Sequence, residues 1–463
     1  MNRTAFSVIL LFAVVSLYAQ DITGSWEGSL VVQNRKLRLL FHIEQNDTTL
    51  TTKMDSPDQG AFGLPTTRTS FEETRVEIIA TGLGLYYTGT LENDTIRGVF
   101  NQGGIPFPLL LIRAEKPQFN RPQTPSEPLP YISEEVTIIT DNEENTSLAG
   151  TLTLPASDGV FPAVVLIAGS GPNDRDETLF GHKPFLVISD YLTRNGFAVL
   201  RYDKRGVGAS SGDYSKATIH HFADDAHAAV EYLKQRREID HSHIGLLGHS
   251  EGGIIAPMVA AGDNEIDFIV MMAAPGTKGI EIVMDQNDNS MKQQGMEPET
   301  IEKIQKIHRE LFESLLEWDG SENDRTALRD KLLFSWEQLP LLIKLKVEKE
   351  PYLRSQFNAL ITPGYRSFLA MDPAIYNEKV SCPVYAINGE NDTQVPAEKN
   401  LTAIKRALQK GRNYRGVTKS YPGLNHIFQE SITGEMNEYA NIEQTIYPEV
   451  LSDILHWMRK QVE

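Results

Sequence analysis

The chain divides into two regions by its pattern of hydrophobic and polar positions. In the first, from residue 24 to residue 113, short runs either alternate between apolar and polar residues or are rich in β-branched and aromatic residues, and Asn46-Asp47 and Asn93-Asp94 stand at expected turns. These runs are 28–32, 36–43, 50–54, 76–79, 86–91 and 95–100. The pattern predicts a small antiparallel β domain over residues 20–114, a curved sheet or barrel, which serves either as a ligand-binding module or as a scaffold.

The second region, residues 132–463, has the pattern of an α/β protein. Residues 134–140 and 147–154 alternate like an antiparallel pair of strands. Apolar runs then alternate with helical stretches such as 222–236; the runs are 163–168, 197–202, 244–247, 268–272 and 383–388. This order predicts a doubly wound, mostly parallel sheet whose site lies at the carboxyl ends of the strands. Residues 115–131, with five prolines, are expected to be a semi-rigid linker.

A charged segment, residues 276–373, interrupts this alternation. Its Leu, Trp and Phe residues recur at helical spacing and predict helices at 300–318, 325–336 and 339–349. Because the segment follows the strand that ends near Ala274, we expect it to be a helical cap over the strand ends. Its apolar faces would either line a substrate pocket or pack the helices on their neighbours.

The N-terminus has the features of a signal peptide over residues 1–19. Arg3 precedes an apolar stretch, 5–17, and Leu17-Tyr18-Ala19 ends in a small residue. The stretch is shorter than the ~20 residues of a membrane span, so we expect export to a bacterial periplasm or exterior without stable membrane insertion. An uncleaved anchor is the alternative.

Composition excludes some classes of partner and crosslink. The net charge is −18 and the pI is about 5.1, so phosphate backbones would repel the chain and nucleic acid is not an expected partner. Cys382 is the only cysteine; we expect it to be a buried small residue, and it cannot form an intrachain disulfide.

The most informative motif is Gly248-His249-Ser250-Glu251-Gly252. It follows an apolar strand and precedes a helical stretch, as a G-x-S-x-G nucleophile elbow requires. The elbow holds its serine on a strained turn, so its neighbours must be nearly free of side chains. Ser250 is therefore the predicted nucleophile, in preference to a plain glycine-rich turn.

An acid and a base are expected after the nucleophile in the order Ser, Asp or Glu, His. The strand at 383–388 leads into a loop with two acids, of which Asp392 is preferred and Glu390 is the alternative. His426 follows a later strand, 414–420, in a second loop. It would present one ring nitrogen to Ser250 and donate the other N–H to Asp392.

Acyl transfer also requires hydrogen-bond donors for the developing oxyanion. The N–H of Glu251, next to the nucleophile, is the first predicted donor. The glycine-rich loop 168–176 supplies the second, with Ser170 preferred over Gly171. A phosphate-binding loop is the competing interpretation, but the G-x-x-x-x-G-K pattern is absent and Pro172 lacks an N–H.

With these motifs in order, the chain from about residue 134 resembles an α/β-hydrolase. It is most similar to the bacterial secreted esterase and serine-aminopeptidase-like branch, which has an H-G-S-G-P-x-D-R-D loop, a D-x-R-G-x-G-x-S segment, a G-H-S-E-G-G elbow, a G-E-x-D acid loop and a G-x-N-H base loop. Here these are residues 168–176, 203–210, 248–253, 389–392 and 423–426. One position departs from the family pattern: Ala168 replaces a histidine that usually braces the oxyanion loop.

The resemblance and the triad together predict a serine hydrolase that cleaves carboxylic esters through an acyl-enzyme, with a small-molecule ester as the substrate. This chemistry requires neither a cofactor nor a metal ion. The alternative is a serine aminopeptidase or amidase acting on short peptides. It would need acids in the cap or near the elbow to bind a free α-amine. A non-catalytic binding protein is disfavoured, because all three triad members are present.

Overall fold

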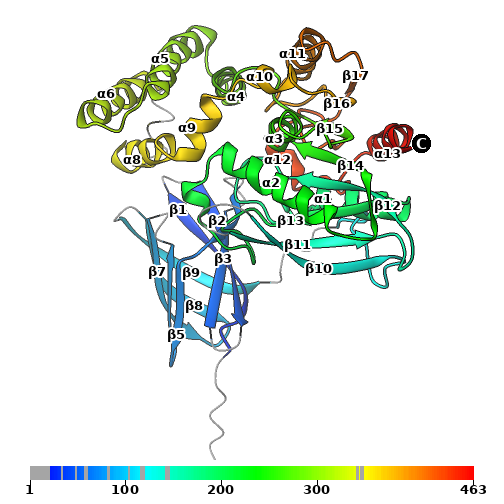
Figure 1. Ribbon diagram of the computed structural model, residues 1–463. Coiled ribbons are helices and arrows are strands. Elements are labelled where there is room, and N and C mark those ends of the chain that lie inside the picture. The colour runs from blue at the N-terminus through cyan, green and yellow to red at the C-terminus, as the bar shows by residue number, and fades with distance from the viewer. Residues whose placement is uncertain are drawn as a thin grey trace, which may run out of the picture. The chain divides into compact units, whose positions relative to one another are not determined.

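The chain forms two compact units, residues 1–118 and 119–463, in the computed structural model (Figure 1). The structure describes residues 21–32, 35–46, 49–56, 61–80, 84–102, 105–114, 120–140, 146–339, 344 and 349–463. The predicted signal peptide and the predicted turn residue Asp47 lie outside these ranges. Each unit is built around its own sheet.

The first unit is a nine-stranded antiparallel sheet in the order β4-β3-β2-β1-β9-β8-β7-β6-β5. Its strands are β1 (Gly24–Val32), β2 (Arg35–Asn46), β3 (Thr49–Ser56), β4 (Ala61–Pro65), β5 (Arg68–Glu72), β6 (Arg75–Ala80), β7 (Leu85–Glu92), β8 (Thr95–Gln102) and β9 (Ile105–Ala114). Thr69 of β5 donates from Oγ1 to Oγ1 of Thr52 of β3 at 2.7 Å, so the sheet curls until its two ends meet. The predicted curved sheet or barrel is confirmed.

Period-two alternation forms the core of this first sheet. Trp26, Phe41, Tyr87 and Phe100 lie on the inner face and are fully buried or nearly so. Asn93 takes a φ of +56° at the tight β7–β8 turn. The sequence patterns did not single out β4, β5 or β9. Two prolines interrupt the strand pattern of β9. They lie in the part of β9 that pairs with β8, outside the residues that pair with β1.

The second unit contains an eight-stranded sheet in the order β10-β11-β13-β12-β14-β15-β16-β17. The strands are β10 (Ile132–Ile139), β11 (Ser147–Leu154), β12 (Phe161–Ile167), β13 (Ala198–Tyr202), β14 (Ile239–His249), β15 (Phe268–Met272), β16 (Val384–Gly389) and β17 (Gly416–Tyr421). β10, β11 and β13 pair antiparallel, and the other neighbours are parallel. The predicted fold class, α/β with a mostly parallel sheet after an all-β domain, is confirmed.

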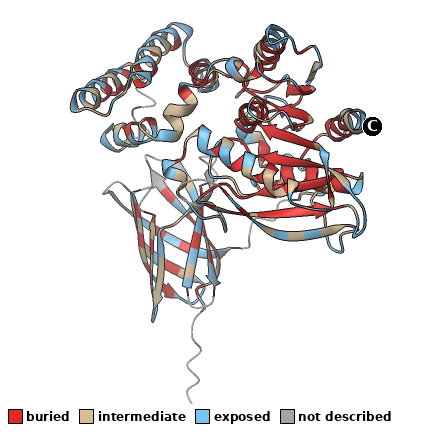
Figure 2. Cartoon of the chain, in the orientation of Figure 1, coloured by how far each residue is buried: buried red, intermediate tan, exposed pale blue. Residues whose placement is uncertain are grey.

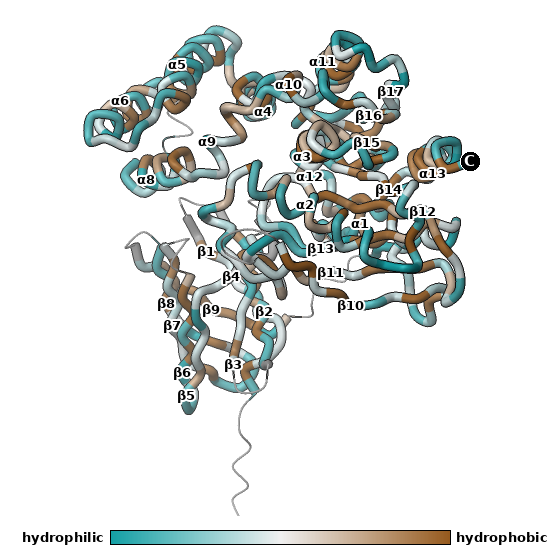
Figure 3. The backbone as a smooth tube through the Cα atoms, in the orientation of Figure 1, coloured by the Kyte–Doolittle hydropathy of each residue, from teal (hydrophilic) through white to brown (hydrophobic). Residues whose placement is uncertain are grey.

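Helices cover both faces of this second sheet. One face packs on α2 (Ile219–Lys234), α3 (Gly252–Ala260) and α11 (Ala397–Lys410), and the other on α1 (Pro184–Arg194) and α13 (Pro448–Val462). Alternate residues of β12 point into the two cores. Strands β13, β15 and β16 are buried along their whole length (Figure 2), and all residues of β15 are hydrophobic (Figure 3). Continuous apolar runs are typical of such doubly covered strands.

The sheet order reverses at β12. The chain leaves β12 for β13 on one side and returns to β14 on the other. In open α/β sheets, the crevice at such a switch point, outside the carboxyl ends of the strands, is where ligands bind. The loops after β12 and β14 are those that carry the predicted oxyanion donors and the predicted nucleophile.

The segment between β15 and β16 is helical, as the sequence predicted. It contains α4 (Gly279–Gln293), α5 (Pro298–Leu316), α6 (Glu322–Gln338), α8 (Lys349–Leu360), α9 (Pro363–Leu369) and the short α10 (Ala374–Asn377), whereas most of the predicted helix 339–349 lies outside the described residues. Buried Phe312, Leu315, Leu328 and Phe357 form part of a separate hydrophobic core for these helices. These apolar faces therefore pack the helices on one another.

The second half of the predicted linker belongs to the second unit. Arg121 donates to the carbonyl oxygens of Phe180, Ala440 and Ile442, and Gln123 donates to that of Ile446. Residues 120–131 are thus tied to this unit by hydrogen bonds, a role that proline spacing alone did not suggest.

Candidate active site

Ser250 lies on a strained turn between β14 and α3. Its φ is +52°, a conformation that residues other than glycine rarely adopt. A Cβ on Gly248 would lie 2.0 Å from the carbonyl oxygen of Gly252, and one on Gly252 would lie 2.0 Å from that of Ile167. Both glycines are therefore required by close backbone contacts, as the elbow motif predicted.

The structure brings Asp392 and His426 together. Asp392 follows β16, His426 follows β17, and Oδ2 of Asp392 lies 2.7 Å from Nδ1 of His426. The other oxygen, Oδ1, accepts the backbone N–H groups of Gln394 and Val395 at 2.8 and 2.9 Å. Both carboxylate oxygens are held, and the side chain of Asp392 is fully buried. The arrangement fixes the ring of His426.

Glu390, the alternative acid, is placed elsewhere. Its side chain is exposed and accepts a hydrogen bond from Oγ of Ser420 at 2.7 Å. Of the two acids in this loop, only Asp392 contacts His426 among the interactions of the described residues.

The loop after β12 lies against the nucleophile. A Cβ on Gly169 would lie 3.2 Å from Cβ of Ser250. Ser170, the predicted donor, is exposed on this loop, and the side chain of Asn173 donates to the carbonyl oxygens of Gly169 and Ser170. The other predicted donor, Glu251, is the N-cap residue of α3, where helix N–H groups have no intrahelical partner.

Two residues that sequence reasoning did not assign hold this loop in place. Glu177, next to the recognised Asp174-Arg175-Asp176 segment, accepts the N–H of Gly169 at 2.6 Å. Lys204 donates to the carbonyl oxygen of Gly169 and lies 3.0 Å from the carboxylate of Glu251. The only signal was position: both are charged residues inside or beside motif segments, at sites that proved to be buried.

His249 directly precedes the predicted nucleophile in the elbow. It is buried, with Nδ1 2.9 Å from Oε1 of Glu177 and Nε2 3.0 Å from the carbonyl oxygen of His426. Burial alone would lower the pKa of His249, but the Glu177 charge and these hydrogen bonds outweigh it, so the pKa is raised.

Two family models match the segments that carry the predicted site residues. A family model described as serine aminopeptidase, S33, matches residues 185–327, which include Ser250, and a dienelactone hydrolase family model matches residues 364–460, which include Asp392 and His426. Both matches are to hydrolase families, and each covers less than half of the chain.

Individual proteins similar to this chain have related descriptions. Esterase EstD of Thermotoga maritima is 39% identical over 30% of this chain, but the match spans only 33% of that protein's length. The bifunctional esterase/perhydrolase DCH of Acinetobacter calcoaceticus is 24% identical over 55% of this chain and 87% of its own. A solved esterase structure from Pyrococcus furiosus aligns with 76% of this chain and over 100% of its own chain, with 17% identity and a TM-score of 0.45.

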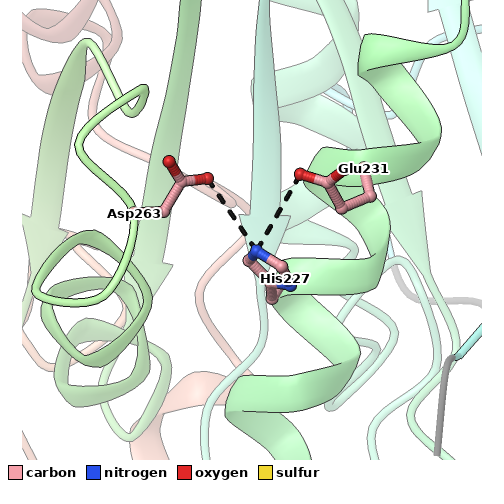
Figure 4. A group of neighbouring side chains, drawn as sticks. All are labelled: His227, Glu231 and Asp263. Carbon is pink, nitrogen blue, oxygen red and sulfur yellow. Dashed lines mark ion pairs between the residues drawn. The ribbon is translucent and has the colours of Figure 1, made fainter.

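Away from the predicted triad, the chain brings together His227, Glu231 and Asp263 (Figure 4). Nε2 of the histidine lies 3.9 Å from each carboxylate. The ammonium of Lys234 lies 2.9 Å from Glu231 and 3.1 Å from Asp263. Since both carboxylates already have the ammonium of Lys234 as an ion-pair partner, we assign no metal to this group. In the part of the chain that the structure describes, no helix is long and apolar enough to span a membrane.

Proposed function

We propose that the chain is a carboxylic-ester hydrolase that acts through Ser250, His426 and Asp392. The observation that carries the proposal is the 2.7 Å contact between Asp392 and His426, in loops that follow neighbouring strands of the sheet that carries the Ser250 elbow. Asp392 would keep the N–H of His426 on Nδ1, which leaves Nε2 to take the proton of Ser250.

The reaction would proceed by acyl transfer. Ser250 attacks the ester carbonyl, and His426 takes its proton and then returns it to the leaving alcohol. The N–H groups of Glu251 and Ser170 would stabilise the oxyanion. Water, activated by the same histidine, then hydrolyses the acyl-enzyme.

The acids at the elbow favour an ester over a peptide with a free α-amine. Glu251 is paired with Lys204, and both side chains are buried. Glu177 is paired with His249 in the same way. A carboxylate that already has a buried cationic partner is a poor ligand for a substrate ammonium, because binding would break the existing pair. The serine aminopeptidase alternative therefore lacks a ready amine site at these two positions.

Hydrolysis rates on matched substrates test this choice. We expect wild-type protein to cleave p-nitrophenyl esters and to leave amino-acid p-nitroanilides nearly untouched. Ser250→Ala should lose the ester activity while keeping the circular dichroism spectrum of the wild type. Larger kcat/KM values on the anilides than on the esters would instead establish the aminopeptidase.

A further inference from the structure

A buried chain of hydrogen bonds joins three loops of the candidate site. It runs from the N–H of Gly169 to Oε1 of Glu177, from the same oxygen to the ring of His249, and from the other ring nitrogen to the carbonyl oxygen of His426. Gly169 belongs to the oxyanion loop, His249 to the elbow, and His426 to the loop of the proposed base. One imidazole therefore connects the three parts that must be aligned for acyl transfer.

The two contacts of the His249 ring require one proton more than a neutral imidazole carries. Both ring nitrogens of His249 face oxygen acceptors, one a carboxylate and one a carbonyl. A neutral imidazole has a single N–H, so with an ionised Glu177 one of the two contacts would lack a proton. The His249–Glu177 pair thus holds one proton more than a neutral imidazole and a carboxylate. The charge of Asp392 also acts on His249, and the ring centroids of His249 and His426 are 4.8 Å apart.

We propose that His249 and Glu177 are positioning residues for the hydrolase reaction. Through the carbonyl of His426 they fix the loop of the base, and through the N–H of Gly169 they fix the oxyanion loop, both relative to the adjacent Ser250. The kinetic part of this inference rests on the proposed ester hydrolysis. The structural part, that His249 sets the position of His426, does not depend on it.

Local backbone geometry supports the assignment. Glu177 has a φ of +53°, which an L residue rarely adopts. A Cβ on Gly169 would lie 3.0 Å from Oε1 of Glu177, so glycine allows the carboxylate to come this close. Unfavourable backbone conformations persist where the surroundings hold them, and they cluster at functional sites.

The kinetic test compares His249→Gln with a matched control. His243 lies on the same strand, β14, and its Nδ1 is 2.9 Å from a carboxylate oxygen of Asp267; among the described residues, no hydrogen bond or ion pair links it to the three loops. We expect His249→Gln to lower kcat on p-nitrophenyl acetate by about 100-fold with little change in KM, since small misplacements of catalytic groups cost about that much. His243→Gln should keep wild-type kcat. Glu177→Gln, which replaces the carboxylate shared by the two donors with a neutral amide, should lower kcat in the same way and serves if His249→Gln does not fold.

A structural readout separates this inference from the proposed function. The proton between His426 and Asp392 should give a resolved low-field resonance in one-dimensional proton NMR. We expect His249→Gln to shift or broaden it and His243→Gln to leave it unchanged. If a folded His249→Gln keeps both the resonance and the wild-type kcat, the positioning role is wrong. If the wild type cleaves no ester but the resonance still responds to His249→Gln, the positioning role stands and the proposed function fails.

Discussion

At the level of single residues, the loop after β16 offers a direct choice between two acids. Asp392 contacts His426, whereas Glu390 is exposed and bonds to Ser420. We expect Asp392→Asn to lower kcat by about 10⁴-fold, because an amide leaves His426 in the wrong tautomer. Glu390→Gln should have little effect on kcat. Reversed effects in steady-state kinetics would make Glu390 the acid.

His182 is expected to make stability depend on pH. It is fully buried, its ring nitrogens contact Thr445 and the carbonyl oxygen of Tyr439, and burial lowers its pKa to about 4. Since the unfolded chain binds this proton at a pKa near 6.5, protonation favours unfolding as the pH falls from about 6.5 toward 4. Neutral His182 makes its full contribution to the folding stability above pH 6.5.

Urea unfolding of the wild type and His182→Gln at pH 7 and pH 5 measures this effect. The wild type should lose about 1–2 kcal/mol more stability than the variant between these two pH values. Equal losses in the two proteins would show that His182 binds its proton equally in the folded and unfolded states.

The residues that could be predicted are those with a local pattern. Ser250 was found because the elbow requires glycines at fixed spacing, and Asp392 and His426 because each follows a strand in the expected order. Glu177 and Lys204 belong to no such pattern, and the elbow motif that contains His249 does not indicate its partners. Their contacts join positions up to 177 residues apart, as in the pairing of His249 with the carbonyl oxygen of His426. Only the tertiary fold brings such partners together.

At the level of elements, the helices between β15 and β16 are held by their own hydrophobic core. Phe312 of α5 is 4% exposed, whereas Phe334 of α6 is 54% exposed. We expect Phe312→Ala to destabilise these helices by about 3–5 kcal/mol, because a buried phenylalanine leaves a cavity. Phe334→Ala should have almost no effect. Hydrogen exchange should become faster in α5, α6 and α9 of Phe312→Ala and remain slow in β14; uniform exchange would mean that the segment is not a separate unit.

Sequence periodicity identified most strands and two of the described helices between β15 and β16, α5 and α6. It missed α4. The apolar residues Ile282, Val283 and Met284 form only a short stretch there, and most of the following residues are polar. It also missed β9, in which Pro106 and Pro108 interrupt a strand pattern. Both elements are stabilised by neighbours distant in sequence, which a local pattern does not contain.

At the level of the whole molecule, the predicted site residues all belong to the unit of residues 119–463. Because residues 120–131 are hydrogen-bonded to this unit, a deletion that removes the first unit should end at residue 118. We expect the protein without residues 20–118 to keep nearly the same kcat/KM on small soluble esters. A truncated protein that is folded by circular dichroism but loses most of this activity would show that the β domain completes the substrate site.

Covalent labelling tests the central claim, that Ser250 is the nucleophile of a serine hydrolase. A fluorophosphonate reacts with a serine activated by a histidine, so mass spectrometry of the treated wild type should find one adduct, on the peptide that contains Ser250. Ser242 is an exposed serine of β14, the strand that leads to Ser250, and Ser242→Ala should label like the wild type. Ser250→Ala should remain unlabelled and inactive on p-nitrophenyl acetate. Labelling of Ser250→Ala at the wild-type rate would contradict the account.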